Sequence, residues 1–276
     1  MPRMESRLDS IRIKPFLKWA GGKRWLVDKH SDLLDVEFDR YIEPFLGSGA
    51  VFFSLAPCSS ILCDKNEELI EAYSAIKNDW QLVFAYLKKH NSNHSKEYYY
   101  KIRSAKFRTP HTRAARFLYL NRTCWNGLYR VNLKGEFNVP MGTKTKVVMD
   151  DDDFEKVSEN LANSELLAGD FELALEKAGA GDFVFVDPPY TIKHNYNGFV
   201  KYNESIFSWQ DQERLRDLVS EATTRGAKVI VTNASHDSIR DLYYNIGEIT
   251  TLNRASVISG KANARGTYDE VVIRCF

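Results

Sequence analysis

Four residues, Asp187-Pro188-Pro189-Tyr190, directly follow an uninterrupted apolar run from Phe183 to Val186. A short apolar run that ends at turn-forming residues is typical of a strand buried on both faces of a parallel sheet. In open α/β sheets, ligands bind at the carboxyl ends of such strands. The segment therefore predicts a ligand-binding turn, although prolines also end strands in ordinary loops.

The same four residues offer a carboxylate, proline carbonyl groups and a flat aromatic ring. The two hydrogens of an exocyclic amino group can bond to the Asp187 carboxylate and to a proline carbonyl, which concentrates the lone pair on the nitrogen. The ring of Tyr190 can stack on the base that carries this amine. We therefore expect the turn to hold an amino-substituted nucleobase during catalysis.

At 276 residues and with 43% hydrophobic residues, the chain is long enough for one large domain or for a core with an insertion. Its four cysteines fit neither a zinc-binding spacing nor a dense disulfide framework. Residues 1–14 lack the apolar region of a signal peptide, and no apolar run is long enough to span a bilayer. We therefore expect a cytoplasmic protein with reduced thiols.

Charge is distributed unevenly along the chain. Residues 96–149 carry twelve basic side chains and two acidic ones, interleaved with aromatic residues, whereas residues 150–182 carry eleven acidic side chains and two basic ones. A solvated helical face would explain part of the basic charge, but not so one-sided a balance. A basic surface with aromatic residues favours binding to a polyanion such as nucleic acid.

The apolar pattern predicts an α/β fold. A strand at Tyr41–Glu43, the turn Gly47-Ser48-Gly49, a helix from Ala50 and a strand at Ile61–Asp64 match one nucleoside-binding half of a Rossmann-like sheet. After that half, a mostly parallel sheet continues and an antiparallel hairpin closes it. The further strands are expected at Leu166–Ala168, Phe183–Val186, Lys228–Thr232, Thr250–Ile258 and Asp269–Phe276.

A segment without this pattern separates the two parts of the sheet. Helix is expected over Glu67–Asn78 and through most of Trp80–Leu120, whereas Asn121–Thr145 is rich in asparagine and glycine and favours a hairpin. We therefore interpret residues 76–150 as an insertion into one catalytic domain, which is made of residues 1–75 and 151–276.

A glycine turn alone indicates only a tight turn, but Asp64 ends the second strand, where a carboxylate would hold a ribose diol. The full G-x-G-x-x-G pattern of dinucleotide-binding proteins is missing, because Val51 and Phe52 follow Gly49. A dehydrogenase is therefore disfavoured, and S-adenosylmethionine suits such a pocket better.

Two further segments are candidates for contact with that cofactor. In Phe16–Lys23, Trp19 could cover an apolar or cationic group and Lys23 could pair with a carboxylate. After a later strand, Asp170 could accept a hydrogen bond from an adenine amino group, and Phe171 could contact the adenine ring. Taken alone, each segment also fits a structural role, as a helix start or as a core aromatic residue.

Four of these segments occur in a set order, namely Phe16–Lys23, Glu43–Phe52, Asp64–Asn66 and Asp187–Tyr190. In this order they resemble the motifs of the Dam-type DNA adenine-N6 methyltransferases, the α-group of the D12 class. The resemblance implies a Rossmann-like methyltransferase fold with an inserted, mainly helical DNA-recognition domain. It also implies methyl transfer from S-adenosylmethionine to N6 of a flipped adenine in double-stranded DNA, with S-adenosylhomocysteine as product and without a metal.

The resemblance assigns roles to individual residues as well. Asp187, Pro188, Pro189 and Tyr190 would be the catalytic residues that hold the flipped adenine. The cofactor-binding residues would be Trp19, Lys23, Glu43, Phe45, Gly47, Ser48, Gly49, Asp64, Asp170, Phe171 and Asp187.

The segment Asn121–Pro140 resembles the recognition hairpin of the GATC-methylating branch of that family. By this similarity Arg130 would read a guanine, to which arginine can form paired hydrogen bonds, and Leu128 would contact a flanking base pair. Trp125 and Asn126 would occupy the space that the flipped base leaves or intercalate beside it.

The other expected contacts include Pro140 with a thymine and Lys18 with the outer guanine. Two positions depart from that branch, because Trp125 stands in place of a tyrosine and Thr143-Lys144 in place of an Arg-Tyr pair. The expected DNA-binding residues are Lys18, Arg122, Trp125, Asn126, Leu128, Arg130, Asn132, Pro140 and Lys144.

Two polar segments complete the expected site. Thr191–Ser208 is predicted to be a loop that orders over the flipped base. The turn Gly260–Gly266 carries Lys261 and Arg265, which would contact a phosphate or only solubilise the surface.

Other functions stay open at this point. Cytosine-N4 methylation uses the same amine chemistry, although a serine in place of Asp187 would be its usual sign. An RNA adenine methyltransferase and a catalytically silent DNA- or cofactor-binding module are the remaining alternatives. The expected setting is a bacterial or phage-encoded protein that acts on DNA as a monomer or weak dimer, in restriction-modification, repair marking, DNA replication, regulation or phage protection.

Overall fold

The computed structural model describes residues 13–132, 134–191, 207–255 and 267–276. The chain divides into two compact units. Unit 1 comprises Met1–Val36 and Leu46–Gly169, and unit 2 comprises Glu37–Phe45 and Asp170–Phe276. Within the described ranges, no helix is both long and apolar enough to cross a membrane.

Two predicted segments lie largely or wholly outside the described residues. Of the expected loop Thr191–Ser208, only the two ends belong to the described residues. The expected turn Gly260–Gly266 lies outside them entirely.

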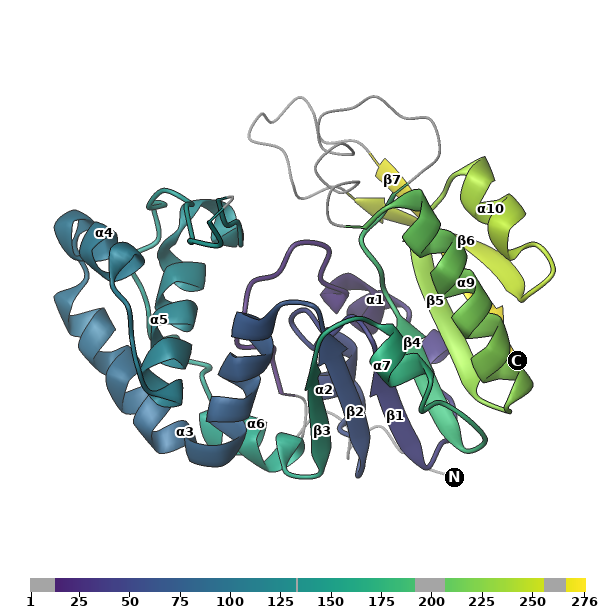
Figure 1. The fold of residues 1–276 in the computed structure, drawn as a ribbon, viewed down its shortest axis with the longest axis horizontal. Coiled ribbons are helices and arrows are strands. Elements are labelled where there is room, and N and C mark those ends of the chain that lie inside the picture. The colour runs from purple at the N-terminus through teal and green to yellow at the C-terminus, as the bar shows by residue number, and fades with distance from the viewer. Residues whose placement is uncertain (1–12, 133, 192–206, 256–266) are drawn as a thin grey trace, which may run out of the picture. The chain divides into compact units, whose positions relative to one another are not determined.

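Unit 1 contains a parallel pair of strands, β2 (Ser60–Asp64) and β3 (Ser164–Ala168), in which Leu62 lies opposite Leu166. Figure 1 shows two of its helices, α3 and α5, side by side, and their packing brings His90 of α3 onto the ring of Tyr119 of α5. The helices are α1 (Arg24–Lys29), α2 (Ala50–Leu55), α3 (Glu67–Asn93), α4 (Lys96–Ser104), α5 (Pro110–Thr123) and α6 (Phe154–Leu161), with the short 3-10 helices η1 (Ser31–Leu34) and η2 (Trp125–Gly127).

Side-chain caps explain where several of these helices begin. Asn66 accepts a hydrogen bond from the backbone N–H of Leu69 at the start of α3, and Ser95 accepts one from Tyr98 at the start of α4. Such caps satisfy backbone donors that have no partner inside the helix. Asp79 has non-helical backbone angles and kinks α3 directly after the end of the helix predicted from the sequence.

The predicted insertion, residues 76–150, begins inside α3, three residues before this kink at Asp79. The two compact units divide the chain elsewhere, since unit 1 includes residues on both sides of the expected insertion. The division into a catalytic and a recognition domain is a prediction about function, and it stays one.

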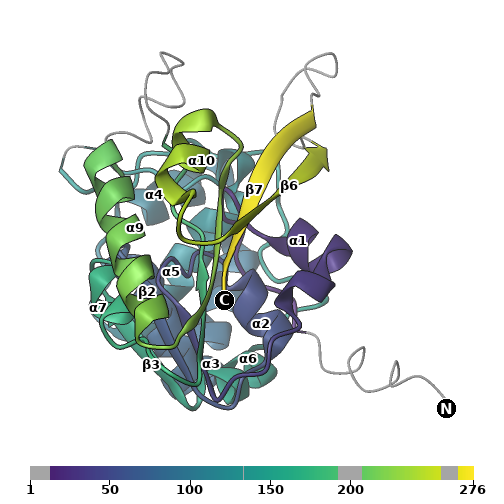
Figure 2. The same cartoon turned by 90° about the vertical axis from the view of Figure 1, so that its right-hand side faces the viewer.

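Unit 2 is built on strands β1 (Arg40–Glu43), β4 (Asp182–Val186) and β5 (Lys228–Ala234), which pair in parallel. Strand β7 (Thr267–Cys275) is antiparallel to both β5 and β6 (Glu248–Ala255), so the order is β1-β4-β5-β7-β6. Figure 2 shows β6 and β7 as the paired strands that close this sheet. In its described part the helices are α7 (Glu172–Leu175), α9 (Trp209–Thr224) and α10 (Asp237–Tyr243).

The predicted fold class, a mostly parallel α/β sheet with an antiparallel closing pair, is confirmed. Every residue of β4 is buried, as the apolar run Phe183–Val186 requires. A continuous apolar run has no polar face to present to water, so it is stable only between layers. This strand carries the tetrapeptide Asp187–Tyr190 at its carboxyl end.

A cluster of aromatic and histidine side chains joins α3, α4 and α5. His90 stacks on Tyr119 with ring centroids 5.0 Å apart, and its Nδ1 lies 2.8 Å from the hydroxyl of Tyr98. Burial disfavours the charged imidazolium and lowers the pKa of His90 from 6.5 to about 4.

We predict that this histidine makes the protein less stable in acid. Below pH 6.5 the unfolded chain binds a proton at His90 that the folded protein does not, so stability falls from about pH 6.5 towards pH 4. At pH 5 the loss from this group should be about 2 kcal/mol. Urea unfolding at pH 7 and pH 5 measures it, and His90→Phe should show a smaller loss. An identical loss in both proteins would contradict the prediction.

Candidate functional site

In unit 2, Asp187 lies where β4 ends, between two parallel neighbours. On the β5 side, the hydroxyl of Thr232 donates a hydrogen bond to Asp187 Oδ1 over 2.8 Å. A carboxylate that accepts such a hydrogen bond has a defined orientation. Sequence analysis missed Thr232, although a hydroxyl near the end of the strand expected after β4 was a usable signal.

Tyr190 is anchored by a residue of β7, the strand that pairs with β5. Its hydroxyl donates to Glu270 Oε2 over 2.7 Å, and Glu270 is a buried residue of β7. Burial, together with the charges of Asp187 and Glu270, raises the pKa of Tyr190 well above its usual value of 10. The phenol therefore stays protonated at neutral pH and keeps its ring in place through this bond.

The carbonyl of Pro189 is engaged within unit 2. The buried side chain of Gln212 in α9 donates to Pro189 O over 3.4 Å, and its own carbonyl accepts from Asn233 over 3.1 Å. Through Gln212 and Asn233, hydrogen bonds connect the tetrapeptide to α9 and to β5. Of the two proline carbonyls, that of Pro188 is therefore the better candidate for accepting a hydrogen from a substrate amine.

Three phenylalanines pack together near the start of α7. Phe171 stacks on Phe45 with centroids 5.3 Å apart, and Phe207 lies 5.7 Å from each of them. The guanidinium of Arg214 sits 4.4 Å from the Phe171 centroid and forms an ion pair with Asp170. Three of the predicted cofactor residues, Phe45, Asp170 and Phe171, are thus brought together within one unit.

Glu43, another predicted cofactor residue of unit 2, is buried at the end of β1. It accepts a hydrogen bond from the hydroxyl of Tyr41 over 2.9 Å. Burial and the nearby carboxylates of Glu43 and Asp187 raise the pKa of Tyr41 well above its usual range. Tyr41 thus repeats the pattern in which a neutral hydroxyl holds a buried carboxylate.

In unit 1, the glycine turn is held by Asp64. Its Oδ2 accepts from the backbone N–H of Gly47 over 3.0 Å, and its Oδ1 accepts from that of Asn66 over 2.9 Å. Burial raises the pKa of Asp64, and the two backbone hydrogen bonds oppose that shift. The carboxylate predicted to hold a ribose therefore also shapes the turn beside it.

Glycine is required in this turn for two reasons. Gly47 and Gly49 have positive φ values of 49° and 65°, which side chains other than glycine rarely adopt. A Cβ atom on Gly47 would also lie 2.8 Å from Cδ1 of Trp19, so the indole packs directly on the backbone. A Cβ on Gly22 would lie 3.3 Å from the hydroxyl of Ser48, so the Phe16–Lys23 segment lies against the turn.

The first motif supplies a second predicted cofactor residue beside Trp19. Lys23 is only 4% exposed, and its ammonium group donates to the carbonyl of Gly21 over 3.1 Å. A buried ammonium group is costly without such partners. Lys23 thus gives the segment expected to bind the cofactor a positive charge whose position is set by a hydrogen bond within the protein.

The predicted recognition segment forms a short hairpin in unit 1. Val131 pairs with Phe137, and backbone hydrogen bonds join Asn138 N to Arg130 O and Asn132 N to Glu136 O. Arg130 is exposed, and its Nε donates to the side chain of Asn138 over 2.8 Å.

Large apolar side chains next to this hairpin face solvent. Trp125 is 51% exposed and Leu128 is 42% exposed, with Asn126 exposed between them. Asn126 has a positive φ of 55°, a conformation that asparagine tolerates better than most residues. Exposed tryptophan and leucine side chains on a basic segment are suited to contact with bases.

Lys18 lies beside this segment and is held by a residue that sequence analysis missed. Asn121 accepts a hydrogen bond from Lys18 N over 3.0 Å and donates to Lys18 O over 2.8 Å. Its amide also donates to Gly127 O, and a Cβ on Gly127 would lie 2.8 Å from the Lys18 Cβ. Burial, and then the positive charge of Lys144, lower the pKa of Lys18, so two predicted DNA contacts lie near each other.

Two of the predicted DNA contacts have other roles in the structure. Arg122 is 2% exposed, and its guanidinium pairs with Asp152 over 2.6 Å and donates to the carbonyls of Val147 and Phe16. These partners enclose the guanidinium within unit 1, whereas contact of Arg122 with DNA stays a prediction.

The second is Asn132, which shapes the hairpin turn. Its side-chain oxygen accepts from the backbone N–H groups of Lys134 and Glu136, and its amide donates to the Glu136 carboxylate. Asparagine commonly closes turns by bonding to backbone groups two or more residues ahead. The structure therefore gives Asn132 a role in the turn itself.

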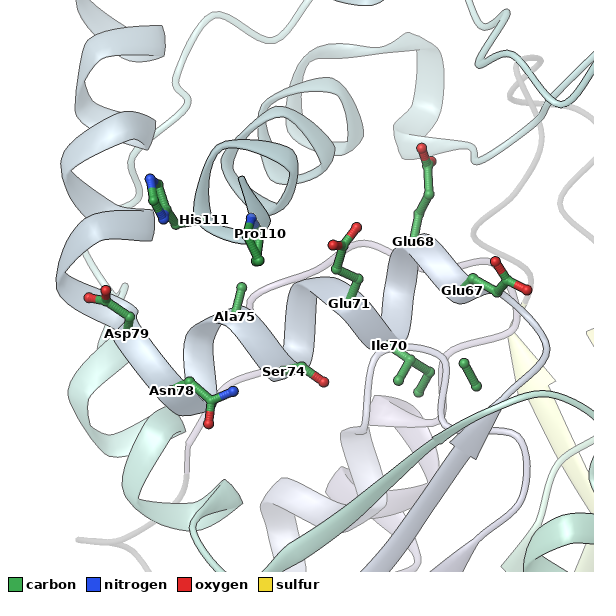
Figure 3. A pocket seen from close by; sticks show the side chains of 11 residues that line it. Glu67, Glu68, Ile70, Glu71, Ser74, Ala75, Asn78, Asp79, Pro110 and His111 are labelled. Carbon is green, nitrogen blue, oxygen red and sulfur yellow. The ribbon is translucent and has the colours of Figure 1, made fainter. Parts of the chain in front are cut away.

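A cavity of about 690 Å³ lies along α3 and the start of α5 (Figure 3). Its lining is strongly acidic, and none of the predicted cofactor- or DNA-binding residues belongs to it. Glu71 pairs with Arg113, and Glu68 pairs with Arg116. Carboxylates along its wall disfavour phosphate groups, so we do not assign this cavity to the reaction. Its lining residues are Glu67, Glu68, Ile70, Glu71, Ser74, Ala75, Asn78, Asp79, Pro110, His111 and Ala168.

We predict that the buried ion pair is needed for stability. Arg122→Met should lower the free energy of unfolding by about 3 kcal/mol or more, because Asp152 would be left buried without its partner. The exposed residue Lys144 offers a matched control, and Lys144→Met should change stability by less than about 0.5 kcal/mol. Urea unfolding measures both. Unchanged stability in Arg122→Met, together with weaker DNA binding, would contradict this prediction and favour a role of Arg122 in DNA binding.

Comparison with known proteins identifies the family. The family model for D12 class N6 adenine-specific DNA methyltransferases matches residues 19–258. The type II methyltransferase M1.LlaDCHI of Lactococcus lactis subsp. cremoris is 37% identical over 96% of each chain. The type II methyltransferase M.MjaIII of Methanocaldococcus jannaschii is 35% identical over 95% of this chain and 99% of the relative. The DNA adenine methylase of Serratia marcescens is 35% identical over 83% of this chain and 87% of the relative. The chain therefore belongs to the D12 class N6 adenine-specific DNA methyltransferase family, and it is an adenine-specific DNA methyltransferase.

Proposed function

We propose that the enzyme uses S-adenosylmethionine to methylate N6 of an adenine that is flipped out of a DNA duplex, within the sequence GATC. The observation that carries the catalytic part is the anchored tetrapeptide at the end of β4. Thr232 holds Asp187, and Glu270 holds Tyr190, through hydrogen bonds within the protein itself. Groups that are oriented in advance do not have to be ordered during the reaction, which lowers the barrier.

The predicted cofactor residues fit S-adenosylmethionine in chemical terms. In unit 1, Asp64 offers a carboxylate for a ribose diol, and Lys23 offers a fixed cation for a carboxylate. In unit 2, Phe171 and Asp170 offer an aromatic ring and an acceptor for adenine. When bound, the cofactor supplies an electrophilic methyl group on sulfur.

The residues of the tetrapeptide would act on the amine. Asp187 and the carbonyl of Pro188 would each accept one amino hydrogen, which frees the nitrogen lone pair from conjugation with the ring. Tyr190 would stack on the adenine and keep the amine in the plane of these two acceptors. No side chain needs to form a covalent bond to the base, because the amine itself is the nucleophile.

The DNA-binding part of the proposal rests on the exposed side chains of the hairpin region. Trp125 and Leu128 are apolar and solvent-exposed, and Arg130 lies next to them in the chain. A wedge such as Trp125 would offset part of the few kcal/mol that flipping a base costs. Arg130 would then read a guanine next to the target adenine.

We predict methyl transfer to adenine only in a duplex with the GATC sequence. Labelled S-adenosylmethionine is incubated with two duplexes that differ in a single GATC site, and the product nucleoside is identified. Asp187→Ala should abolish transfer and change DNA affinity by no more than a few-fold, because the carboxylate acts on the amine alone. Methylation of cytosine N4, or of both duplexes equally, would contradict the proposal.

A second prediction tests the assignment of Arg130. Arg130→Ala should cost about 1–3 kcal/mol of discrimination at one base pair and relax specificity there. Lys134, an exposed cation in the same hairpin, is the matched control, and Lys134→Ala should weaken binding equally on all sequences. Binding is measured on duplexes with each base pair of the site changed in turn. A uniform loss in Arg130→Ala would mean that it contacts a phosphate.

A further inference from the structure

Tyr129 joins two segments to which the sequence assigns different ligands. It lies in the recognition segment, and its ring stacks on that of Trp19, with centroids 5.8 Å apart and an interplanar angle of 29°. Trp19 belongs to Phe16–Lys23, the segment expected to bind the cofactor. Both residues belong to unit 1, so the contact lies within one compact body.

The position of Tyr129 depends on the hairpin. Its ring lies 5.6 Å from that of Phe117 and 5.8 Å from that of Phe137, which pairs with Val131 across the hairpin. Its hydroxyl donates to Glu68 Oε2 over 2.8 Å. A displacement of the hairpin would therefore move Tyr129 or break these contacts.

The position of Trp19 depends in turn on the glycine turn. Cδ1 of the indole would lie 2.8 Å from a Cβ on Gly47, whose N–H is bonded to Asp64. The backbone next to Trp19 is held as well, because Asn121 bonds to both the N–H and the carbonyl of Lys18. The Trp19 indole thus lies between the glycine turn and the recognition segment, in contact with both.

We propose that Tyr129 is a positioning residue that holds Trp19 for the cofactor and couples cofactor binding to DNA binding. The inference rests on the proposed function, since it takes Trp19 as a cofactor contact and the hairpin as a DNA contact. DNA that holds the hairpin in place should also hold Tyr129 in place, and with it the Trp19 indole on which Tyr129 stacks. Each ligand should then strengthen binding of the other by the same factor, as linkage requires.

The test compares two substitutions in the complete protein. Tyr129→Leu removes the stacked ring, whereas Tyr129→Phe keeps the ring and removes the hydroxyl with its contacts to Glu68 and Asn66. For each, the dissociation constant of S-adenosylhomocysteine is measured without DNA and with a saturating GATC duplex, and the ratio gives the coupling factor. Without DNA, Tyr129→Leu should weaken binding of S-adenosylhomocysteine by about two- to tenfold, which corresponds to the free energy of one aromatic pair. It should also bring the coupling factor close to 1. Tyr129→Phe should keep both values near those of the wild type.

Two results would overturn the inference. Wild-type affinity and coupling in a folded Tyr129→Leu protein would show that the stack has no role in binding. An equal loss in Tyr129→Phe would assign the effect to the hydroxyl and its contacts instead of the ring. Thermal unfolding of both variants verifies that they are folded.

A measurement on the wild type keeps the test independent of any variant. Binding of the duplex alone should slow amide hydrogen exchange in Trp19–Lys23, and unchanged exchange there would also overturn the inference. The same wild-type protein is assayed for methyl transfer to adenine. If the wild type transfers no methyl group, the proposed function fails. If the wild type is active but Tyr129→Leu keeps the wild-type coupling factor, only this inference is contradicted.

Discussion

The local structure of unit 1 depends on the carboxylate of Asp64. One oxygen accepts the N–H of Gly47 in the glycine turn, and the other accepts the N–H of Asn66 at the start of α3. A buried carboxylate is costly unless hydrogen bonds replace its water, and these two backbone donors do so. Because Trp19 packs on Gly47, the same carboxylate also determines where the first motif can lie. A residue placed by the sequence at a ligand site thus acts first as a fold-forming residue.

Unit 2 holds its carboxylates by a different means, through hydrogen bonds from hydroxyl groups. Neutral hydroxyls serve as the donors, from Thr232 to Asp187 and from Tyr190 to Glu270. An arginine would bind a carboxylate more tightly, but it would compete with an incoming amine for the same oxygens. A hydroxyl orients Asp187 without placing a positive charge beside it. The raised pKa of Tyr190 keeps its hydroxyl a donor over the whole neutral range.

The strands and the turn at the end of β4 could be predicted because each leaves a local signal. The run Phe183–Val186 can only be buried, and Asp187 follows it directly, so neighbouring residues are sufficient to place both. Arg122 shows the limit of such reasoning, since its partner Asp152 is thirty residues away and a charge count cannot separate a buried ion pair from a surface charge. Asn121 was overlooked for the same reason, because its bonds to Lys18 span more than a hundred residues.

These pairings also change how the basic segment 96–149 should be interpreted. Among the described residues, four of its twelve cations form ion pairs, namely Arg113 with Glu71, Arg116 with Glu68, Arg122 with Asp152 and Lys146 with Asp150. Two of those carboxylates come from the acidic segment that follows it in the chain. The opposite charges of the two segments therefore partly cancel by direct contact, which net charge along the sequence cannot reveal. Affinity for DNA should follow the cations that stay exposed, such as Arg130 and Lys144, and not the total.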